Sequence, residues 1–440
     1  MWLHAGTRTI AVPVATGSMH LNIDSDQLWQ DIRANGNLGS VPTDDPEANA
    51  RTVLAGSKAN EDARDRLISR MQEIGLSVSV DAVGNILGEW YPEGVSQDAD
   101  PVVAGSHLDS VPSGGIFDGP LGVYGALEAV RAVKEGSADA TLTAPLGVVC
   151  FTEEEGARFS DGLLGSSVAS GARDLDATLA ETDDDGVSLG DALESIGYQG
   201  EGRLDVSEWA GWYELHIEQD TTLETAAVPV GVVTTITGIT RCDVTITGQA
   251  NHAGATGMTD RTDALAAASE FILNVETAAA GVAAEDSDTA VGTVGSLSVS
   301  PGATNVVPGQ VTMGVDIRDV DADPIETIVT AARESLARLE TDRDVDTTIT
   351  RPFDLRPVEM SSHLRDAAHK AGEAAGVSTH NLHSGAAHDS MNVARHTDAA
   401  LLFAPSRDGI SHNPREWTDP DDCADATRVL AGSILETASR

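Results

Sequence analysis

One segment, residues 102–129, constrains the fold more than any other part of this chain. Its short apolar run VVA predicts a buried strand that ends at Gly105, and His107 comes two residues later. Asp109 follows, a glycine-rich loop leads to Asp118, and after Pro120 the apolar residues recur at helical spacing. Polar side chains therefore follow the carboxyl end of a strand, where open α/β sheets place their chemistry. On its own this pattern is also compatible with an ordinary polar loop.

Several other predicted strands also end in polar side chains. The apolar run LGVVCF leads directly into Glu153, Glu154 and Glu155, and ionised carboxylates at such a place are costly unless they are solvated or bind a cation. A glutamate triplet is also typical of an acidic surface, and a histidine within a strand is commonly structural. Such nitrogen and oxygen ligands, without cysteine, suit a pair of divalent ions bridged by a carboxylate. Five side chains have this placement within one predicted domain: His107, Asp118, Glu155, His216 and His412.

The chain has 440 residues, too many for one ordinary hydrophobic core, so we expect two domains. Its pattern changes after about residue 230, where the order becomes strand, helix, strand, strand, helix, strand. This order predicts a small α+β sandwich, residues 231–351, inserted into the chain. The α/β domain that carries the candidate ligands then consists of residues 1–230 and 352–440.

The net charge of −43 arises from acidic residues spread along the whole chain, with only three lysines. Dispersed acid is typical of a solvated surface adapted to high salt, although a functional acidic patch is the alternative. This charge argues against nucleic acid and anionic membranes as partners. The three cysteines suit no disulfide framework, which favours a reducing cytoplasm. No apolar run approaches the length of a membrane span, and residues 10–16 are not typical of a signal peptide.

An ordered set of motifs carries a resemblance over nearly the whole chain after about Ser25. The motifs are GSHLDSVPSGGIFDGPLGV, FTEEEGARF, ELHIEQ, NHAGATGMTDRTDA, NVVPGQVTMGVDIR, HSGAAHDSMN and SHNPREWT. With them the chain resembles the co-catalytic metal family of aminoacylases and peptidases. Within that family it is most similar to N-carbamoyl-L-amino-acid hydrolases, allantoate amidohydrolases and β-ureidopropionases. The resemblance implies a zinc-aminopeptidase-like catalytic domain with an inserted α+β lid that also forms a dimer.

The resemblance also implies roles for the candidate ligands. Asp118 would bridge two divalent ions, zinc or else manganese, cobalt or nickel, and a hydroxide shared by the two ions would attack the substrate. Asp109 would orient a ligand histidine, and Glu154 would act as the general base. Glu153 stands where relatives often carry Asn, so a shift of this assignment by one residue stays open. The remaining ligands would be His107, Glu155, His216 and His412.

Substrate contacts are implied in both domains. Arg318 would bind a substrate carboxylate through two hydrogen bonds, unless it forms an ordinary salt bridge at the strand edge. His252 would stabilise the oxyanion, reaching across from the other subunit of a homodimer. Gln219 and, less clearly, His388 would contact a ureido group, and Asn305 would also contact the substrate.

These expectations combine into one reading of the chain. It predicts a homodimeric, cytoplasmic hydrolase that converts N-carbamoyl-L-amino acids into amino acid, carbon dioxide and ammonia. Allantoate amidohydrolase and β-ureidopropionase are the alternatives, and an aminoacylase, a peptidase or a non-catalytic binding protein fit the motifs less well. The expected partners are a small ureido substrate with a carboxylate and a second copy of the chain.

Overall fold

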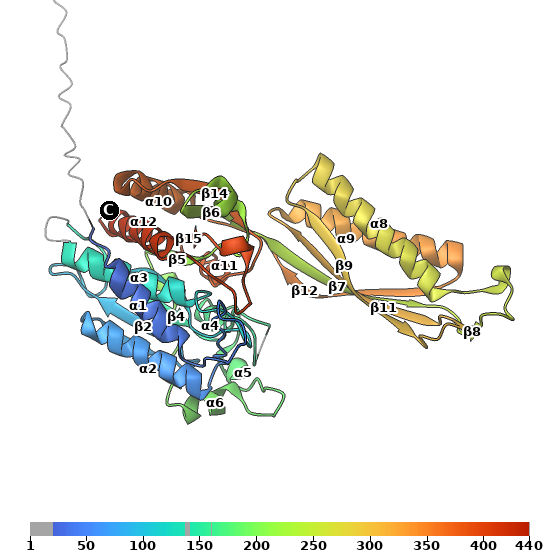
Figure 1. Cartoon of the computed structure of the whole chain (residues 1–440), viewed down its shortest axis with the longest axis horizontal. Coiled ribbons are helices and arrows are strands. Elements are labelled where there is room, and N and C mark those ends of the chain that lie inside the picture. Colours follow the sequence, from blue (N-terminus) through green and yellow to red (C-terminus); the bar gives the residue numbers. More distant parts are fainter. Residues whose placement is uncertain (1–20, 137–140, 160, 440) are drawn as a thin grey trace, which may run out of the picture.

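A computed structural model describes residues 21–136, 141–159 and 161–439. The described chain forms two domains that lie side by side, joined where β6 leads into β7 and where β12 leads into β13 (Figure 1). The predicted α/β catalytic domain with an inserted α+β domain is confirmed by this arrangement. The expectation for residues 10–16 lies outside the described residues.

The catalytic domain is built on a mixed sheet of nine strands, in the order β1-β2-β4-β3-β5-β15-β6-β13 with β14 also paired to β6. Its strands β4, β3, β5 and β15 run parallel, so their carboxyl ends lie along one edge. All residues of these four strands are buried, as expected for parallel strands covered on both faces. The strands are β1 (Ser77–Val80), β2 (Ile86–Trp90), β3 (Val102–His107), β4 (Leu146–Phe151), β5 (Gly211–Ile217), β6 (Val230–Ile236), β13 (Val358–Glu359), β14 (Thr379–Ser384) and β15 (Ala399–Ala404).

Helices cover this sheet and hold its core. Ser57 caps α2 by accepting a hydrogen bond from the Asn60 backbone N–H, and the chain leaves that helix through Gly75 at positive φ. The long helices α3 and α12 pack on each other and on β3 and β5. The helices of this domain are α1 (Ser25–Gly36), α2 (Lys58–Glu73), α3 (Pro120–Gly136), α4 (Leu164–Ala169), α5 (Leu175–Leu179), α6 (Leu189–Ser195), α7 (Thr222–Ala226), α10 (Ser362–Ala375), α11 (Ser390–Val393) and α12 (Pro420–Ala438).

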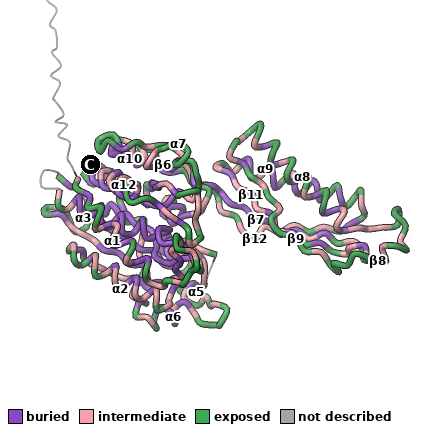
Figure 2. Tube along the Cα trace, in the orientation of Figure 1, coloured by how far each residue is buried: buried purple, intermediate pink, exposed green. Residues whose placement is uncertain are grey.

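The inserted domain, called the lid below, has an antiparallel sheet of four strands in the order β12-β7-β11-β9. Helices α8 and α9 pack on one face with a core of their own, whereas the other face has no helix over it (Figure 2). A short pair, β8 and β10, forms the far end of the lid. The lid elements are β7 (Gly238–Thr247), β8 (Asn251–His252), α8 (Ala264–Glu285), β9 (Val291–Ser300), β10 (Val306–Val307), β11 (Gln310–Asp319), α9 (Ala322–Arg343) and β12 (Asp346–Leu355).

The strands also show where the chain crosses between domains. The predicted boundary at residue 230 falls at the start of β6, which pairs with β15 in the catalytic sheet. The predicted boundary at residue 351 falls inside β12, which belongs to the lid sheet. The crossings lie instead near Gly238 and Pro357, which pack against each other. The β-branched run that marked the change of pattern thus spans strands of both domains.

Helix α8 is long and apolar enough to cross a membrane by length and composition. It packs on α9 and on the lid sheet through buried residues such as Phe271 and Val275. An amphipathic core helix passes the same test of length and composition, so this feature is accounted for by lid packing.

Candidate metal centre

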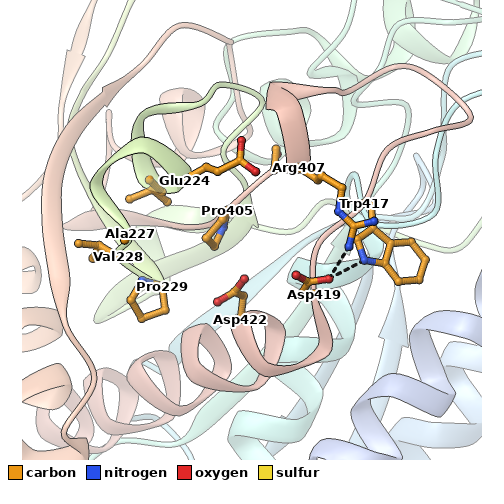
Figure 3. Close-up of a pocket in the computed structure, with 11 residues that line it drawn as sticks. Glu224, Ala227, Val228, Pro229, Pro405, Arg407, Trp417, Asp419 and Asp422 are labelled. Carbon is orange, nitrogen blue, oxygen red and sulfur yellow. Dashed lines mark hydrogen bonds and ion pairs between the residues drawn. The ribbon is translucent and has the colours of Figure 1, made fainter.

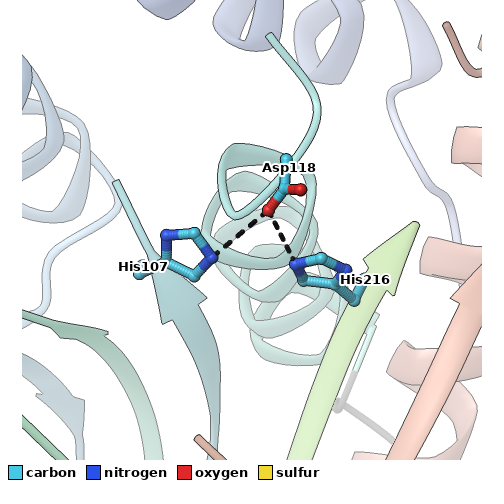
Figure 4. Close-up of side chains that lie close together, drawn as sticks. All are labelled: His107, Asp118 and His216. Atoms are coloured by element: carbon cyan, nitrogen blue, oxygen red, sulfur yellow. Dashed lines mark ion pairs between the residues drawn. The ribbon is translucent and has the colours of Figure 1, made fainter. Parts of the chain in front are cut away.

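The side chains of His107 and His216 converge on one carboxylate oxygen of Asp118 (Figure 4). Nε2 of His107, at the end of β3, lies 3.5 Å from Asp118 Oδ1, and Nε2 of His216, on β5, lies 3.1 Å from the same atom. All three side chains are buried. The parallel order of β3 and β5 brings the two histidines together, and the loop before α3 brings Asp118 between them.

The second carboxylate oxygen of Asp118 faces another pair of candidate ligands. His412 Nε2 lies 3.5 Å from Asp118 Oδ2 and 3.2 Å from Glu155 Oε2. The ligand atoms of each group, His107–Asp118–His216 and Asp118–Glu155–His412, lie within 4.8 Å of one another. Asp118 belongs to both groups, so the five predicted ligands are brought together around one shared carboxylate.

The histidine tautomers also fit cation binding. Nδ1 of His107 lies 3.2 Å from the Asp109 carbonyl oxygen, and Nδ1 of His216 lies 3.0 Å from the Ile217 carbonyl oxygen. Because a carbonyl only accepts, each Nδ1 carries a proton, so each Nε2 is the nitrogen that would offer its lone pair to a cation beside Asp118. Nε2 of His107 is buried with no hydrogen-bond partner among the described residues. An orphaned buried acceptor beside a carboxylate is the environment that a divalent cation satisfies.

The three consecutive glutamates after β4 point in different directions. Glu154 Oε2 lies 3.7 Å from His107 Nε2, and Glu155 faces His412. Glu153 is buried at positive φ and accepts hydrogen bonds from two backbone N–H groups, of residues 158 and 159. The left-handed backbone at Glu153 is a conformation that Asn tolerates well. The geometry thus favours Glu154 and Glu155, rather than Glu153, as the pair facing the cluster.

Asp109 lies between the two ligand groups. Its Oδ1 is 3.7 Å from His107 Nδ1, and its Oδ2 accepts a hydrogen bond of 3.1 Å from the Glu155 backbone N–H. The carbonyl of Asp109, rather than its carboxylate, is the nearer acceptor for the His107 ring. The carboxylate therefore bridges His107 to the segment that carries Glu155.

Crowding of carboxylates and imidazoles shifts the pKa values of these buried groups. Burial raises the pKa of Glu154 well above its usual value, with His107 opposing and Asp389, Glu155 and Asp118 adding to it. Burial lowers the pKa of His107, but Glu154 and the neighbouring carboxylates outweigh it and leave that pKa well above its usual range. The two histidines overcome the effect of burial on Asp118, whose pKa lies well below its usual value. Divalent cations would compete with the protons that this cluster attracts.

Two further predicted contact residues lie beside the ligands. Gln219 Nε2 donates to Asp118 Oδ2 at 2.8 Å and to Ser411 Oγ at 3.0 Å, whereas its Oε1 is buried with no partner in the described structure. His388 is buried with its ring edge-on to that of His216, and burial lowers its pKa well below the usual value. His388 therefore presents a neutral imidazole next to the cluster.

Sequence reasoning missed two buried residues that position Asp118 and the loop before it. Glu416 Oε1 accepts hydrogen bonds from the backbone N–H groups of Phe117 at 2.9 Å and Asp118 at 3.0 Å. Arg51 is fully buried and donates to the carbonyl oxygens of Gly115 and Asp109, at 3.0 and 3.4 Å. Glu416 lies in the SHNPREWT motif, which is the only sequence signal that points to it. Arg51 carries no local signal because its contacts are all distant in sequence.

A cleft of about 680 Å³ opens beside the cluster, between the catalytic domain and the lid. Its walls include Asp118, Glu154, His216, Gln219, His388 and His412 from the catalytic domain, with Arg318 from the lid. Arg318 donates to the Gly385 carbonyl oxygen at 2.9 Å, which links the lid to the loop that carries His388. It also pairs with Asp316 on its own strand at 2.7 Å.

His252 and Asn305 are not brought to this cleft. Both are exposed at the far end of the lid, around β8 and β10 (Figure 1), where the Ala253 backbone N–H donates to the Asn305 carbonyl oxygen. Within one chain they therefore lie apart from Asp118 and its ligands.

A smaller hollow of about 230 Å³ lies between α7 and the start of α12 (Figure 3). There, Asp419 Oδ1 forms an ion pair with Arg407 Nη2 at 2.7 Å and accepts a hydrogen bond from Trp417 Nε1 at 2.8 Å. Burial raises the pKa of Asp422, which lines the same hollow, to about 6. This hollow contains none of the predicted site residues.

A family model described as Peptidase family M20/M25/M40 matches residues 103–436. The chain belongs to this peptidase family. It is 37% identical over 420 residues to an N-carbamoyl-L-amino acid amidohydrolase of Geobacillus stearothermophilus, covering 94% of this chain and 99% of the relative. It is 34% identical to a ureidoglycolate hydrolase of Oryza sativa subsp. japonica, covering 94% and 85%.

Solved structures agree with the sequence relatives. An amidase of the hydantoinase/carbamoylase family from Burkholderia multivorans superposes with a TM-score of 0.87 at 33% identity, covering 96% of this chain and 99% of the other. The M20/M25/M40 member described here is therefore a metal-dependent amidohydrolase of the hydantoinase/carbamoylase branch. Its activity falls in the group that includes carbamoylases, ureidoglycolate hydrolases and allantoate hydrolases.

Proposed function

We propose that the chain hydrolyses N-carbamoyl-L-amino acids to the amino acid, carbon dioxide and ammonia. The observation that carries this proposal is the position of Gln219 Oε1. This acceptor is buried beside Asp118 without a partner among the described residues, and it belongs to a side chain that lines the cleft. A ureido group ends in an NH₂ donor that satisfies such an acceptor, whereas the methyl group of an N-acetyl substrate leaves it unpaired.

The amide of Gln219 is oriented by its other contacts. Its NH₂ group faces an Asp118 carboxylate oxygen and the Ser411 hydroxyl, and reversing the amide would place two acceptors, Oε1 and the carboxylate, against each other. The Gln219 backbone N–H is held by Ser406 Oγ at 2.9 Å, and its φ is positive. The Gln219 acceptor is therefore fixed in place before substrate arrives. This supports discrimination between ureido and N-acetyl substrates, because only the ureido NH₂ group pairs with the acceptor.

Recognition of the substrate carboxylate is assigned to Arg318. Its guanidinium lines the cleft and is positioned from the lid by Asp316 and from the catalytic domain by Gly385. Two parallel hydrogen bonds from a guanidinium to a carboxylate are favoured by their matching planar geometry. The N-carbamoyl group of the substrate would then lie toward Gln219, His388 and Glu154.

The residues of the cluster fit two divalent cations, one held by His107, Asp118 and His216 and one by Asp118, Glu155 and His412. Cations bound there would polarise the carbamoyl carbonyl and lower the pKa of water. Ligands of this type suit zinc, manganese, cobalt or nickel.

Proton transfer is assigned to Glu154. Its carboxyl group is close to His107, is nearly buried and has a raised pKa, so it is suited to accept a proton from water near neutral pH. The same carboxyl group then delivers that proton to the leaving nitrogen. Asp109 orients His107 and accepts a hydrogen bond from the Glu155 backbone N–H. It thereby fixes the position of one ligand group relative to the other.

The proposal includes a homodimer formed through the lid. Four of the five large hydrophobic side chains exposed in the described structure lie on the lid: Met258, Leu273, Val291 and Leu297. Strand β9 is an edge strand with one unpaired side, and exposed apolar residues at an edge favour association. A second copy docked there would carry its His252 and Asn305 toward another chain, where His252 would stabilise the developing oxyanion.

The proposed setting is a salt-rich, reducing cytoplasm. The 70 acidic residues against 27 basic ones support a surface adapted to high salt, because salt screens the repulsion between like charges. The three cysteines are buried and free, which is consistent with a reducing compartment.

Allantoate amidohydrolase is the second candidate. The 35% identity to a probable allantoate deiminase of Oryza sativa subsp. japonica, over 88% of this chain, favours it. Allantoate also carries a carboxylate and ureido NH₂ groups, so it would use the same Gln219 and Arg318 contacts.

Ammonia release decides between these candidates. Metal-loaded protein in molar salt would be assayed with N-carbamoyl-L-amino acids, allantoate, β-ureidopropionate and N-acetyl-L-amino acids, the last by amino-group release. We expect the highest kcat/KM for N-carbamoyl-L-α-amino acids. A preference for allantoate would move the protein to the second candidate. No turnover of any ureido compound, with bound metal verified, would overturn the proposal.

A further inference from the structure

A second arginine stands beside Arg318 on the cleft-facing side of the lid sheet. Arg241 on β7 lies directly opposite Asp316 on β11, and Arg318 is two residues farther along β11, on the same face. Asp316 contacts both guanidinium groups, with Nε of Arg318 at 2.7 Å and Nε of Arg241 at 3.4 Å. Both arginines line the cleft of about 680 Å³.

The two guanidinium groups are held with different strength. Arg318 makes two contacts to Asp316 and a third to the Gly385 carbonyl oxygen. Arg241 makes one long contact to Asp316 and lies over the Phe353 ring, 4.9 Å from the ring centre. Neither terminal nitrogen of Arg241 has a hydrogen-bond partner in the described part of the chain. An exposed ion pair of this length contributes little stability, so an arriving anion can compete for Arg241.

We propose that Arg241 is a second anion-binding residue of the cleft and holds the substrate carboxylate together with Arg318. This inference rests on the proposed function, which it deepens by naming the group that completes carboxylate recognition. Arg318 and Arg241 with Asp316 sum to one positive charge, which matches a single carboxylate. The Phe353 ring packs against the Arg241 guanidinium and restricts the movement of that side chain.

The charge of the whole chain makes this arrangement informative. With a net charge of −43, the protein repels an anionic substrate, and even molar salt leaves that repulsion unscreened within about 3 Å. Carboxylate binding therefore depends on cations within the cleft. Two adjacent arginines that share one acidic partner leave net positive charge on the lid side of the cleft, whereas Arg343 and Arg351, elsewhere on the lid, each have acidic partners of their own.

The test compares N-carbamoylglycine with its carboxamide, N-carbamoylglycinamide, in the metal-loaded protein. Replacing Arg241 by Gln should raise KM for the acid by about tenfold with kcat little changed, as expected for loss of a charge-assisted hydrogen bond. KM for the carboxamide should stay within about twofold. Arg241→Lys should recover part of the affinity for the acid because the positive charge is kept.

A matched control separates local binding from long-range charge. Arg343 lies on helix α9 of the lid and pairs with Glu270 on the surface, away from the cleft residues. Arg343→Gln removes the same charge and should leave the KM ratio of acid to carboxamide unchanged. An unchanged ratio in Arg241→Gln would overturn the inference, as would an equal rise for both compounds.

A direct measurement of carboxylate binding tests the role of Arg241 separately from the proposed hydrolysis. Calorimetric titration of the metal-loaded Glu154→Gln protein with N-carbamoylglycine and with N-acetylglycine measures carboxylate binding without turnover. If the wild-type protein hydrolyses no ureido compound, the proposed function fails, yet weaker binding of either acid to Arg241→Gln/Glu154→Gln still supports the carboxylate role. Equal binding with and without the Arg241 guanidinium, or no binding of either acid, would contradict it.

Discussion

The catalytic domain and the lid prepare their functional side chains in opposite ways. His107, Asp118 and His216 are almost fully buried and are already in contact with each other. On the lid, His252 is exposed at the far end and its ring accepts hydrogen bonds from the Gly254 and Ala255 backbone N–H groups, while Arg241 is half exposed. The first set is preorganised by parallel strands, whereas the proposed function assigns the contacts of the second set to substrate or to a second copy of the chain.

This difference separates chemistry from recognition. Preorganised groups lower the barrier of the reaction, so their loss acts on kcat. Groups that meet only the substrate carboxylate after docking act on KM, and a group supplied by another subunit acts on kcat only in the assembled dimer. Mutations in the two domains should therefore differ in kind as well as in size.

The largest effect expected here is that of Glu154→Gln in the catalytic domain. Loss of the general base should lower kcat by about 10²- to 10⁴-fold, while the protein still binds two metal ions per chain, because Glu154 lies outside both ligand groups. Ammonia release and metal analysis measure these quantities. Glu153→Gln is the matched control and should keep most of the turnover, since its carbonyl oxygen still accepts from the backbone N–H groups of residues 158 and 159. An active Glu154→Gln protein would refute its role.

The next prediction concerns His252 on the lid. His252→Ala should lower kcat by about 10²-fold, the usual loss when one oxyanion donor is removed. If His252 acts on the neighbouring subunit, dimers mixed from His252→Ala and Glu154→Gln chains contain one intact site per mixed dimer. Equal mixing should then restore about a quarter of the wild-type activity, because half of the dimers are mixed. Activity no higher than the average of the two separate variants would place His252 within its own chain or outside the site.

The smallest expected effect concerns stability at the hollow shown in Figure 3. Burial raises the pKa of Asp422 to about 6, and Asp419 and Asp425 add to the shift, compared with about 3.9 in an unfolded chain. The stability that Asp422 contributes is therefore present below about pH 4 and is lost as the pH rises through about 6. Asp422→Asn should raise the melting temperature by on the order of 1–2 °C at pH 8 and less at pH 5.

Salt provides a further check on the Asp422 prediction. Molar salt screens the repulsion that Asp419 and Asp425 exert on Asp422. The rise in melting temperature of Asp422→Asn at pH 8 should therefore be smaller in molar salt. Glu93→Gln, an exposed acid in a loop, is the control for a general loss of negative charge. An Asp422→Asn protein with the same melting difference at pH 5 and pH 8 would show that the carboxyl titrates normally.

Much of the candidate metal centre was predictable because parallel strands share one edge. His107, Glu155 and His412 each follow an apolar run in the sequence, and the order of β3, β4 and β15 in the sheet places those ends near Asp118. The lid fold was predictable from its order of strands and helices. Local periodicity predicts the type and order of the elements, since the spacing of apolar residues within each element indicates its buried face.

Other features of the site and of the domain division depend on contacts between residues distant in sequence, which no local pattern predicts. Glu416 holds the backbone of Asp118 from 298 residues away, and Arg51 holds the preceding loop from 64 residues away. The pairing of Arg241 with Asp316 depends on the register of β7 and β11. Domain boundaries were misplaced for a related reason: β-branched strands look alike whichever sheet they join.

The most direct test of the whole account is a cation titration of metal-free protein, followed by ammonia release from an N-carbamoyl-L-amino acid. Zinc, manganese, cobalt and nickel would each be added in steps, with bound metal counted at each step. The account predicts two ions per chain and full turnover only when the second is bound, with both sites lost in Asp118→Ala. Two bound ions without any ammonia release, or full turnover with a single ion, would contradict it.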